Sequence, residues 1–205
     1  ARLQSILEDM GFFFRLGRKT TRIHGEQRVS QVHLDSEEAL PADMVLISAG
    51  VRPNLDLATQ LGVQTDKGVI VDAFLQTSQP DIYAAGDVTE FQGRVYGIWP
   101  ASMDQGRLAG RNMAGQTEAY QGTVMANTLK VVGIDLASAG EIDVEDQFDS
   151  RVNATEDFYR KIVLDQGHII GCIMLGDTDG FQSVTRMMQE KTEVKEQVES
   201  ILARD

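Results

Sequence analysis

Apolar positions at helical spacing open the chain, and Gly11 is well placed to end the helix that they predict. Residues 12–16 are short and aromatic, which predicts a buried strand. Residues 19–24 and 28–34 alternate more loosely around a glycine, which predicts a β-hairpin. Residues 43–50 form a continuous apolar strand ending in small residues. Such strands are usually covered on both faces, as in a parallel sheet.

Helices and strands alternate through the middle of the chain. The pattern predicts a helix over 55–61 that stops at Gly62, a strand over 69–75, a buried strand over 82–85, and a helix over 101–113 that closes at Gly115. This alternation, with apolar strands that need cover on both faces, indicates an α/β fold.

The polar, irregular stretch 117–127 predicts a domain boundary, and the chain changes character beyond it. The pattern there predicts strands over 129–137, 158–164 and 168–175, and helices over 181–189 and 193–202. The last two strands read as a hairpin across an Asp-Gln-Gly turn. We expect Thr178 or Asp179 to cap the first of the two helices.

Composition and charge exclude several functional classes. The 205 residues carry 19 Lys and Arg against 31 Asp and Glu, a net charge of −12, whereas nucleic acids and anionic membranes require a basic face. No apolar run approaches the roughly 18 residues of a membrane span. One cysteine can form neither an internal disulfide nor a CxxC pair, and with no secretory signal we expect a cytoplasmic protein.

Residues 77–87, TSQPDIYAAGD, carry the first candidate site. An apolar strand there would deliver a small-residue tip to the carboxyl edge of a sheet, where α/β proteins bind ligands. Gly86 would allow close approach of the backbone to a ligand, and the Asp87 carboxylate could accept hydrogen bonds from sugar-alcohol hydroxyls. The alternative is that both are ordinary turn or cap residues.

A helix that starts near Pro100 carries the second candidate site. Proline is comfortable at the first helical position, but the preceding Trp99 has no side-chain oxygen to cap the free amides. Together with the helix dipole, those amides could face the electron-rich edge of a cofactor. The alternative is that water, Ser102 or Asp104 satisfies them.

Other polar clusters give weaker signals. Residues 177–180, DTDG, lack the end ligands of a calcium loop and read as a helix N-terminal turn. The three histidines lack metal-ligand spacing, and Cys172 reads as a small core residue, so we expect no metal site. The acidic stretch 141–149 reads as a solvated loop, with a docking surface for a basic partner as the alternative.

Several segments, in order, resemble the pyridine nucleotide-disulfide oxidoreductase superfamily. Residues 77–87 resemble its second flavin-binding motif, and VLISAGVRPN at 45–54 resembles the segment that returns from the nicotinamide domain to the flavin domain. GIWPASMDQG and the helix after it also match in place and order. The tail, with LKVVGIDLASAGE and YRKIVLDQGHIIGCIMLGDT, is similar to the C-terminal domain of NADH:rubredoxin reductases and NADH-nitrite reductase large subunits.

The resemblance implies FAD and NAD(P)H as cofactors. It implies that Asp87 binds the ribityl chain of FAD, with Gly86 allowing the approach. It further implies that amides around Trp99, Pro100 and Ala101 face the pyrimidine edge of the isoalloxazine, and that Ala49 and Gly50 lie near the nicotinamide nucleotide. Hydride acceptance by the flavin needs no side-chain acid or base here, so no catalytic residue is assigned.

The two Gly-x-Gly-x-x-Gly loops of this superfamily do not occur in the chain, so we expect a fragment of a longer protein. The resemblance implies the end of the NAD(P)H-binding domain over 1–52, the last part of the FAD-binding domain over 53–118, and a small α+β domain over 119–205. The predicted fold is therefore α/β, with partial, doubly wound dinucleotide-binding domains including a three-stranded meander.

Two functional hypotheses follow. The first is a fragment of an FAD-dependent NAD(P)H oxidoreductase that passes electrons to a small redox protein, oxygen or another redox centre. The second is a non-catalytic fragment for dimerisation or partner docking that binds no cofactor by itself. A homodimer is compatible with either hypothesis.

Overall fold

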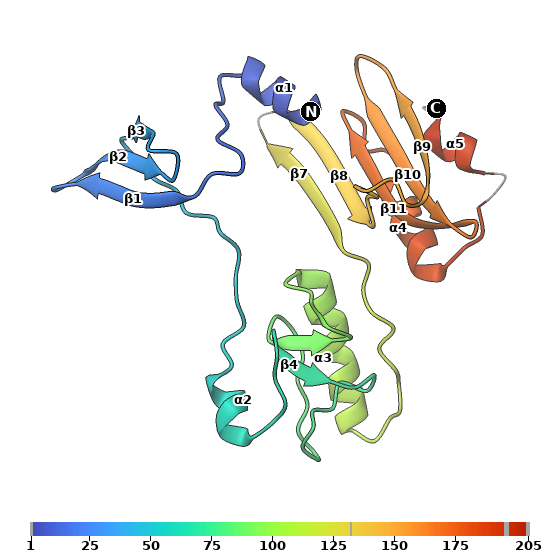
Figure 1. Ribbon diagram of the computed structural model, residues 1–205. Helices are drawn as coiled ribbons and strands as arrows, with labels where there is room; N and C mark the ends of the chain where they lie inside the picture. Colours follow the sequence, from blue (N-terminus) through green and yellow to red (C-terminus); the bar gives the residue numbers. More distant parts are fainter. Residues whose placement is uncertain (1, 132, 195–196, 204–205) are drawn as a thin grey trace. The chain divides into compact units, whose positions relative to one another are not determined.

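A computed structural model describes residues 2–131, 133–194 and 197–203. Contacts between residues divide the chain into two compact units, Ala1–Gly50 and Val51–Asp205. The elements of each unit are labelled in chain order in Figure 1. Among the described residues, no helix combines the length and apolar character needed to cross a membrane.

The first unit contains one helix and a three-stranded antiparallel meander. Its elements are α1 (Arg2–Asp9), β1 (Thr20–Gly25), β2 (Val29–Leu34) and β3 (Ala39–Pro41), with strand order β1-β2-β3. The predicted helix and hairpin are confirmed. Gly25 closes the hairpin because a methyl group at this position would collide with the backbone carbonyl of Arg28.

Two predictions for the first unit are wrong. Residues 12–16 and 43–50 form no strand, and most of their apolar side chains are exposed, with Phe13 and Leu46 each 88% accessible to solvent. A strand needs a neighbour for its backbone hydrogen bonds. Within the described residues neither segment pairs with another strand, so neither belongs to a sheet.

The second unit begins with a small α/β layer. Its elements are α2 (Asp56–Leu61), β4 (Val69–Val71), β5 (Thr89–Phe91), β6 (Arg94–Val95) and α3 (Trp99–Met113). Strand β5 lies between a parallel β4 and an antiparallel β6. Both predicted helices are confirmed, and Gly62 ends α2 in the left-handed conformation at φ 67°. One face of α3 is buried against this layer through Leu108 and Ala109.

The strands predicted around these helices are shorter or absent. The strand predicted over 69–75 stops at Val71, because the Asp72 carboxylate accepts hydrogen bonds from the backbone N–H groups of Phe74 and Gln76 and turns the chain. Residues 82–85 make one isolated bridge, between Gln76 and Tyr83, and are no strand. They are only partly buried, packed against the two small cores of this layer.

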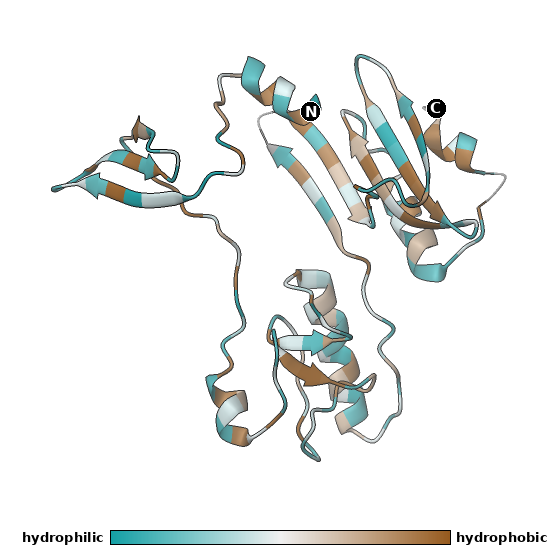
Figure 2. Cartoon of the chain, viewed as in Figure 1, coloured by the Kyte–Doolittle hydropathy of each residue, from teal (hydrophilic) through white to brown (hydrophobic). Residues whose placement is uncertain are grey.

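A five-stranded antiparallel sheet with two helices forms the rest of the second unit. Its elements are β7 (Ala126–Val131), β8 (Ile134–Gly140), β9 (Asp149–Ala154), β10 (Tyr159–Asp165), β11 (His168–Leu175), α4 (Phe181–Glu190) and α5 (Val198–Leu202). The strand order is β7-β8-β11-β10-β9. Apolar residues of β10 and β11, brown in Figure 2, pack with those of α4 and α5 in one core. The predicted β10–β11 hairpin is confirmed, and so is the α/β class of the whole chain.

The structure corrects three details of this sheet. The strand predicted over 129–137 is split between β7 and β8, with Gly133 at φ 77° in the turn. The stretch 141–149 is not simply a solvated loop, because Asp143 is only 3% exposed and β9 begins at Asp149. Strand β9 is absent from the prediction, since its residues alternate too weakly to stand out.

The terminal helices also differ from the prediction at their first residues. Gly180, in the left-handed conformation at φ 81°, precedes α4, and no side-chain cap is formed by Thr178 or Asp179. The helix predicted over 193–202 is the shorter α5, and part of the predicted range, residues 195–196, lies outside the described residues.

Candidate functional site

The tip at Gly86 and Asp87 lies against the first turns of α3. The backbone N–H of Gly86 donates to Oε1 of Gln105 at 2.8 Å, and Oγ of Ser102 donates to Oδ1 of Asp87 at 3.0 Å. The two candidate sites in the sequence, a loop tip and a helix start, therefore meet in space. They are brought together by side chains of the helix.

Gly86 adopts φ +88°, a left-handed conformation that other residues rarely accept. Its carbonyl accepts a hydrogen bond from the N–H of Thr89 at 2.9 Å, so Gly86 also opens a tight turn. A methyl group at Gly86 would meet only the Ser102 side chain, at 3.7 Å. The interpretation of Gly86 as a turn glycine and its interpretation as a point of ligand approach are thus compatible.

Asp87 is exposed and has capacity to accept further hydrogen bonds. One of its oxygens accepts from Ser102, and among the described residues the other accepts none. Among the described residues, no backbone N–H donates a hydrogen bond to the Asp87 carboxylate. The geometry therefore leaves a carboxylate oxygen available to a hydroxyl-bearing ligand.

The start of α3 has no side-chain cap. Ile98 is the N-cap residue, with extended backbone at φ −130°, and Trp99 rather than Pro100 is the first helical residue. The single proton of the Ser102 hydroxyl is shared between the Asp87 carboxylate and the Ile98 carbonyl, and Asp104 pairs with Arg107, so the alternative of a cap from Ser102 or Asp104 is wrong. The free amides of this first turn, at the positive end of the helix dipole, have no side-chain acceptor.

Four further candidate residues differ in their surroundings. Trp99 is 78% exposed and Ala101 only 1% exposed, so the indole projects from the helix start while the alanine packs beneath it. Ala49 and Gly50 end the first unit outside any helix or strand, with Gly50 in the left-handed region at φ +79°. Because they belong to the first unit, their relation to the tip at Asp87 stays a prediction.

Comparison with known proteins assigns the family. Residues 1–106 match the family model described as pyridine nucleotide-disulphide oxidoreductase. The chain belongs to this family. Residues 126–192 match a second model, described as the rubredoxin NAD+ reductase C-terminal domain, which corresponds to the five-stranded sheet and α4.

Individual relatives agree with this assignment. The assimilatory nitrate reductase electron transfer subunit of Bacillus subtilis strain 168 is 36% identical over 86% of this chain and 23% of that protein. The NADH-rubredoxin oxidoreductase of Clostridium acetobutylicum is 33% identical over 68% of this chain and 37% of that protein. A crystal structure of an FAD-dependent pyridine nucleotide-disulphide oxidoreductase from Desulfovibrio vulgaris superimposes with a TM-score of 0.78 at 27% identity, over 98% of this chain and 57% of that chain.

The chain spans less than two thirds of the length of each of these proteins. Both family models follow one another along the chain in the order that the sequence motifs indicated. The resemblance inferred from the motifs is thus confirmed as family membership.

In this member of the family, two polar side chains of the site were missed or misread from sequence. Gln105 is fully buried, and Ser102 contacts Asp87 instead of capping the helix. The signal for Gln105 lies in the helix periodicity. It stands on the face that also carries Ala101 and Leu108, so a polar residue there indicates a buried hydrogen-bond partner.

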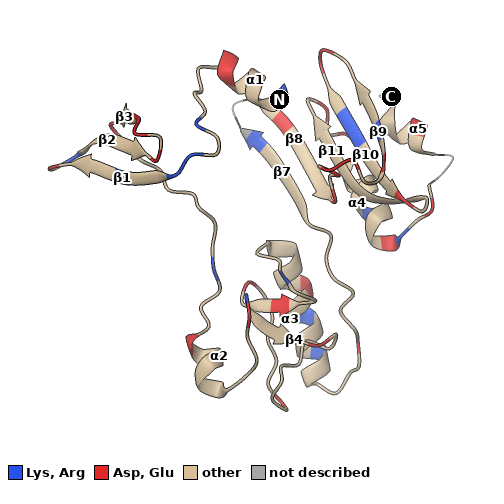
Figure 3. Cartoon of the chain, in the orientation of Figure 1, with Lys and Arg blue, Asp and Glu red and all other residues tan. Residues whose placement is uncertain are grey.

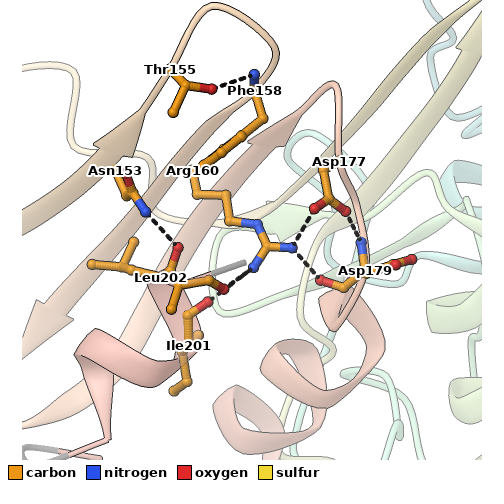
Figure 4. Close-up of polar contacts among 9 residues, drawn as sticks. Asn153, Thr155, Phe158, Arg160, Asp177, Asp179, Ile201 and Leu202 are labelled. Carbon is orange, nitrogen blue, oxygen red and sulfur yellow. Dashed lines mark hydrogen bonds and ion pairs between the residues drawn. The ribbon is translucent and has the colours of Figure 1, made fainter. Parts of the chain in front are cut away.

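A second polar cluster in this family member is structural. The side chain of Arg160, the second residue of β10, is 6% exposed. Lys and Arg residues are blue in Figure 3. Figure 4 shows the Arg160 guanidinium donating from Nη1 to the carbonyls of Ile201 and Ala203, and from Nη2 to the carboxylate of Asp177 and the carbonyl of Asp179. Residues 177–180 thus form the turn before α4, and Asp177 serves as the partner of a buried arginine.

The remaining titratable candidates lie in structural positions. Cys172 is fully buried in the sheet core, and burial raises the pKa of its thiol to about 11, as expected for an unreactive core cysteine. Among the described residues, no group of three or more His, Cys, Asp or Glu side chains could hold a metal ion.

Proposed function

We propose that residues 1–205 form part of an FAD-dependent NAD(P)H oxidoreductase. Bound FAD would supply hydride acceptance from NAD(P)H and onward electron transfer. The observation that carries the proposal is the contact between the Gly86–Asp87 tip and the uncapped first turns of α3. It brings together the two features that a flavin with a polyol chain requires.

The residues at the tip fit such a ligand. A carboxylate oxygen of Asp87 can accept hydrogen bonds from ribityl hydroxyls, since Ser102 occupies only the other oxygen. Gly86 has no side chain to obstruct approach, and its conformation is already the left-handed one that the turn requires.

The residues at the helix start fit the other end of the ligand. The amides of Trp99 and Ala101 lie in the first turn of α3, where no side chain caps them and the helix dipole favours negative charge. These groups would orient the pyrimidine edge of an isoalloxazine and stabilise electron density there. Ala49 and Gly50 would lie beside the nicotinamide nucleotide.

The electron acceptor is proposed as a small redox protein, oxygen or another redox centre. Support comes from relatives named NADH-rubredoxin oxidoreductase and nitrite reductase, and from a neighbour solved as a covalent putidaredoxin reductase–putidaredoxin complex. The match of residues 126–192 to a rubredoxin reductase C-terminal domain favours the small redox protein.

The substitution Asp87→Ala in the complete enzyme tests the site. It removes the free carboxylate oxygen without touching the core, so flavin content after purification should fall, measured by visible absorbance against protein concentration. The matched control is Asp104→Ala, which removes a partly exposed carboxylate of α3 that pairs with Arg107. Flavin content unchanged by Asp87→Ala would remove the role assigned to Asp87.

Residues 1–205 by themselves should bind neither FAD nor NADH tightly, because both glycine-rich phosphate loops are absent from these residues. The purified polypeptide should be colourless, and flavin absorbance near one equivalent would contradict this expectation.

The alternative function is association without a cofactor. It is favoured by exposed apolar residues of the first unit, including Phe13 and Ile47, which are 88% and 75% accessible. Sedimentation velocity distinguishes this alternative, since a monomer at all concentrations would count against it.

A further inference from the structure

A buried chain of hydrogen bonds leads away from the tip into the protein. The Gly86 N–H donates to Oε1 of Gln105 at 2.8 Å, and Nε2 of Gln105 lies 3.4 Å from the Tyr120 hydroxyl. That hydroxyl lies 2.7 Å from Oγ1 of Thr123. Gln105 is fully buried, and Tyr120 and Thr123 are 3% and 7% exposed, so water competes little for these groups.

The chemistry of the donors fixes the direction of the first two hydrogen bonds. A backbone N–H can only donate, so the Gln105 oxygen must face Gly86 and its NH₂ group must face Tyr120. The Tyr120 oxygen accepts from that NH₂ group, and in the third hydrogen bond either of the hydroxyls of Tyr120 and Thr123 can donate to the other. Burial raises the pKa of Tyr120, which keeps the hydroxyl protonated and able to donate.

Tyr120 is held firmly enough to act as the fixed end of the chain. Its N–H donates to the carbonyl of Ala73 at 2.7 Å, and its ring packs on Phe91 and Tyr96 with centroid separations of 5.0 and 6.0 Å. The tip has one other side-chain tether, the contact between Ser102 and Asp87, which is exposed. The partly buried bond to Gln105 is therefore the stronger restraint on the Gly86 peptide.

We propose that Gln105 is a positioning residue that holds the Gly86–Asp87 tip in its ligand-binding orientation, with Tyr120 and Thr123 fixing the orientation of its amide. The proposal rests on the proposed function, in which Asp87 binds the ribityl chain of FAD. Without the Gln105 oxygen, the Gly86 N–H has no acceptor and the peptide must rotate toward water. That rotation also turns the Asp87 carboxylate away from its place beside α3.

The first experiment follows the tip in residues 1–205 without any flavin. Gln105→Met keeps the length of the side chain and removes the acceptor, so the Gly86 amide should exchange its hydrogen at least about tenfold faster, which corresponds to about 1.4 kcal/mol. Tyr120→Phe frees the Gln105 amide to rotate and should give a smaller increase of about threefold. The matched control is Asn112→Leu, which removes a buried amide of the same helix that bonds to Phe74 and Glu118.

The control separates positioning from general destabilisation. Asn112→Leu should accelerate hydrogen exchange of the amides along α3 without a special effect on the Gly86 amide. Gln105→Met should accelerate exchange of the Gly86 amide more than that of the Leu108 amide in α3. Equal acceleration of Gly86 in both variants, or none in Gln105→Met, would overturn the proposal.

The second experiment uses the complete flavin-loaded enzyme. Gln105→Met should raise the dissociation constant for FAD about tenfold and shift the visible absorption bands of the remaining bound flavin, a readout that a merely structural role would not change. If Asp87→Ala loses flavin while Gln105→Met keeps wild-type affinity and spectrum, the positioning role is refuted. If Asp87→Ala keeps its flavin, the proposed function fails, whatever the exchange of Gly86 shows.

Discussion

Replacement of Arg160 by methionine should cost the five-stranded sheet and its helices a large part of their stability. The Arg160 guanidinium makes four hydrogen bonds, at 3.3 Å to Ile201, 2.8 Å to Ala203, 3.0 Å to Asp177 and 3.2 Å to Asp179. Methionine keeps most of the apolar stem but none of these bonds. The two carbonyls at the end of α5 and the carboxylate before α4 lose their common donor.

The magnitude follows from the burial of the ion pair. The side chains of Arg160 and Asp177 are 6% and 14% exposed, so water replaces the hydrogen bonds of the arginine poorly when the arginine is removed. Breaking a buried pair from one side typically costs about 3–5 kcal/mol. A comparable exposed pair, Arg151 with Asp149, has side chains 48% and 54% accessible, and its loss should cost less than about 1 kcal/mol.

Cys172 provides the assay, because it is the single cysteine of the chain and lies fully buried in the same core as α4 and α5. Its thiol can react with a disulfide reagent only when this part of the chain opens. The rate of labelling, measured against urea concentration, therefore reports the free energy of opening. Arg160→Met should accelerate labelling in dilute urea by about two to four orders of magnitude.

Arg151→Met is the matched control, since it removes the same guanidinium from the neighbouring strand β9. The reasoning would be refuted if Arg160→Met and Arg151→Met changed the labelling rate equally. Such a result would mean that the bonds of Arg160 to α5 and to the turn before α4 contribute no more than a surface ion pair.

Two further predictions concern acid stability and the backbone of the tip. Hydrogen bonds to Asp143, first that from the Ser150 hydroxyl, lower the pKa of this carboxyl. The stabilisation is therefore present above the unfolded pKa of about 4 and is lost as the pH falls through the lower folded value. Ser150→Ala should reduce the loss of unfolding free energy between pH 7 and pH 2, measured by urea unfolding at each pH. An unchanged dependence of the unfolding free energy on pH would argue against this role of the Ser150 hydrogen bond. Gly86→Ala should destabilise the second unit by about 1 kcal/mol, because alanine resists φ +88° although its methyl group has room. Thermal unfolding followed by circular dichroism measures this loss, and an unchanged midpoint would show that the backbone can relax.

Elements whose stability is local were predictable from the sequence. The β10–β11 hairpin follows from two apolar runs across a short turn, and α3 follows from its periodicity and its final glycine. Residues 12–16 and 43–50 were wrongly predicted to be strands. An apolar run indicates that a segment tends to be buried, but it does not say which neighbouring strand could pair with that segment. The turn between β7 and β8 was missed because apolar residues continue on both sides of Gly133.

The site divides in the same way. Gly86, Asp87 and the helix start carry a motif that is written in consecutive residues, so the sequence indicated them. The partners Ser102 and Gln105 depend on how α3 lies against the tip, which only the structure provides. The absence of a side-chain cap at the start of α3 was predicted correctly. The first residue of the helix was predicted one position too late, because the extended residue before the helix is Ile98 and the helix begins at Trp99.

The strand order of the five-stranded sheet determines when this sheet can be completed. Strand β7 pairs with β8, and β9 with β10, so each pair can form as a hairpin of sequence neighbours. Among the described strands, β11 comes last along the chain and lies between β8 and β10, so it joins the two hairpins. During synthesis the sheet therefore stays in two separate halves, with open edges, until the residues after His168 have left the ribosome.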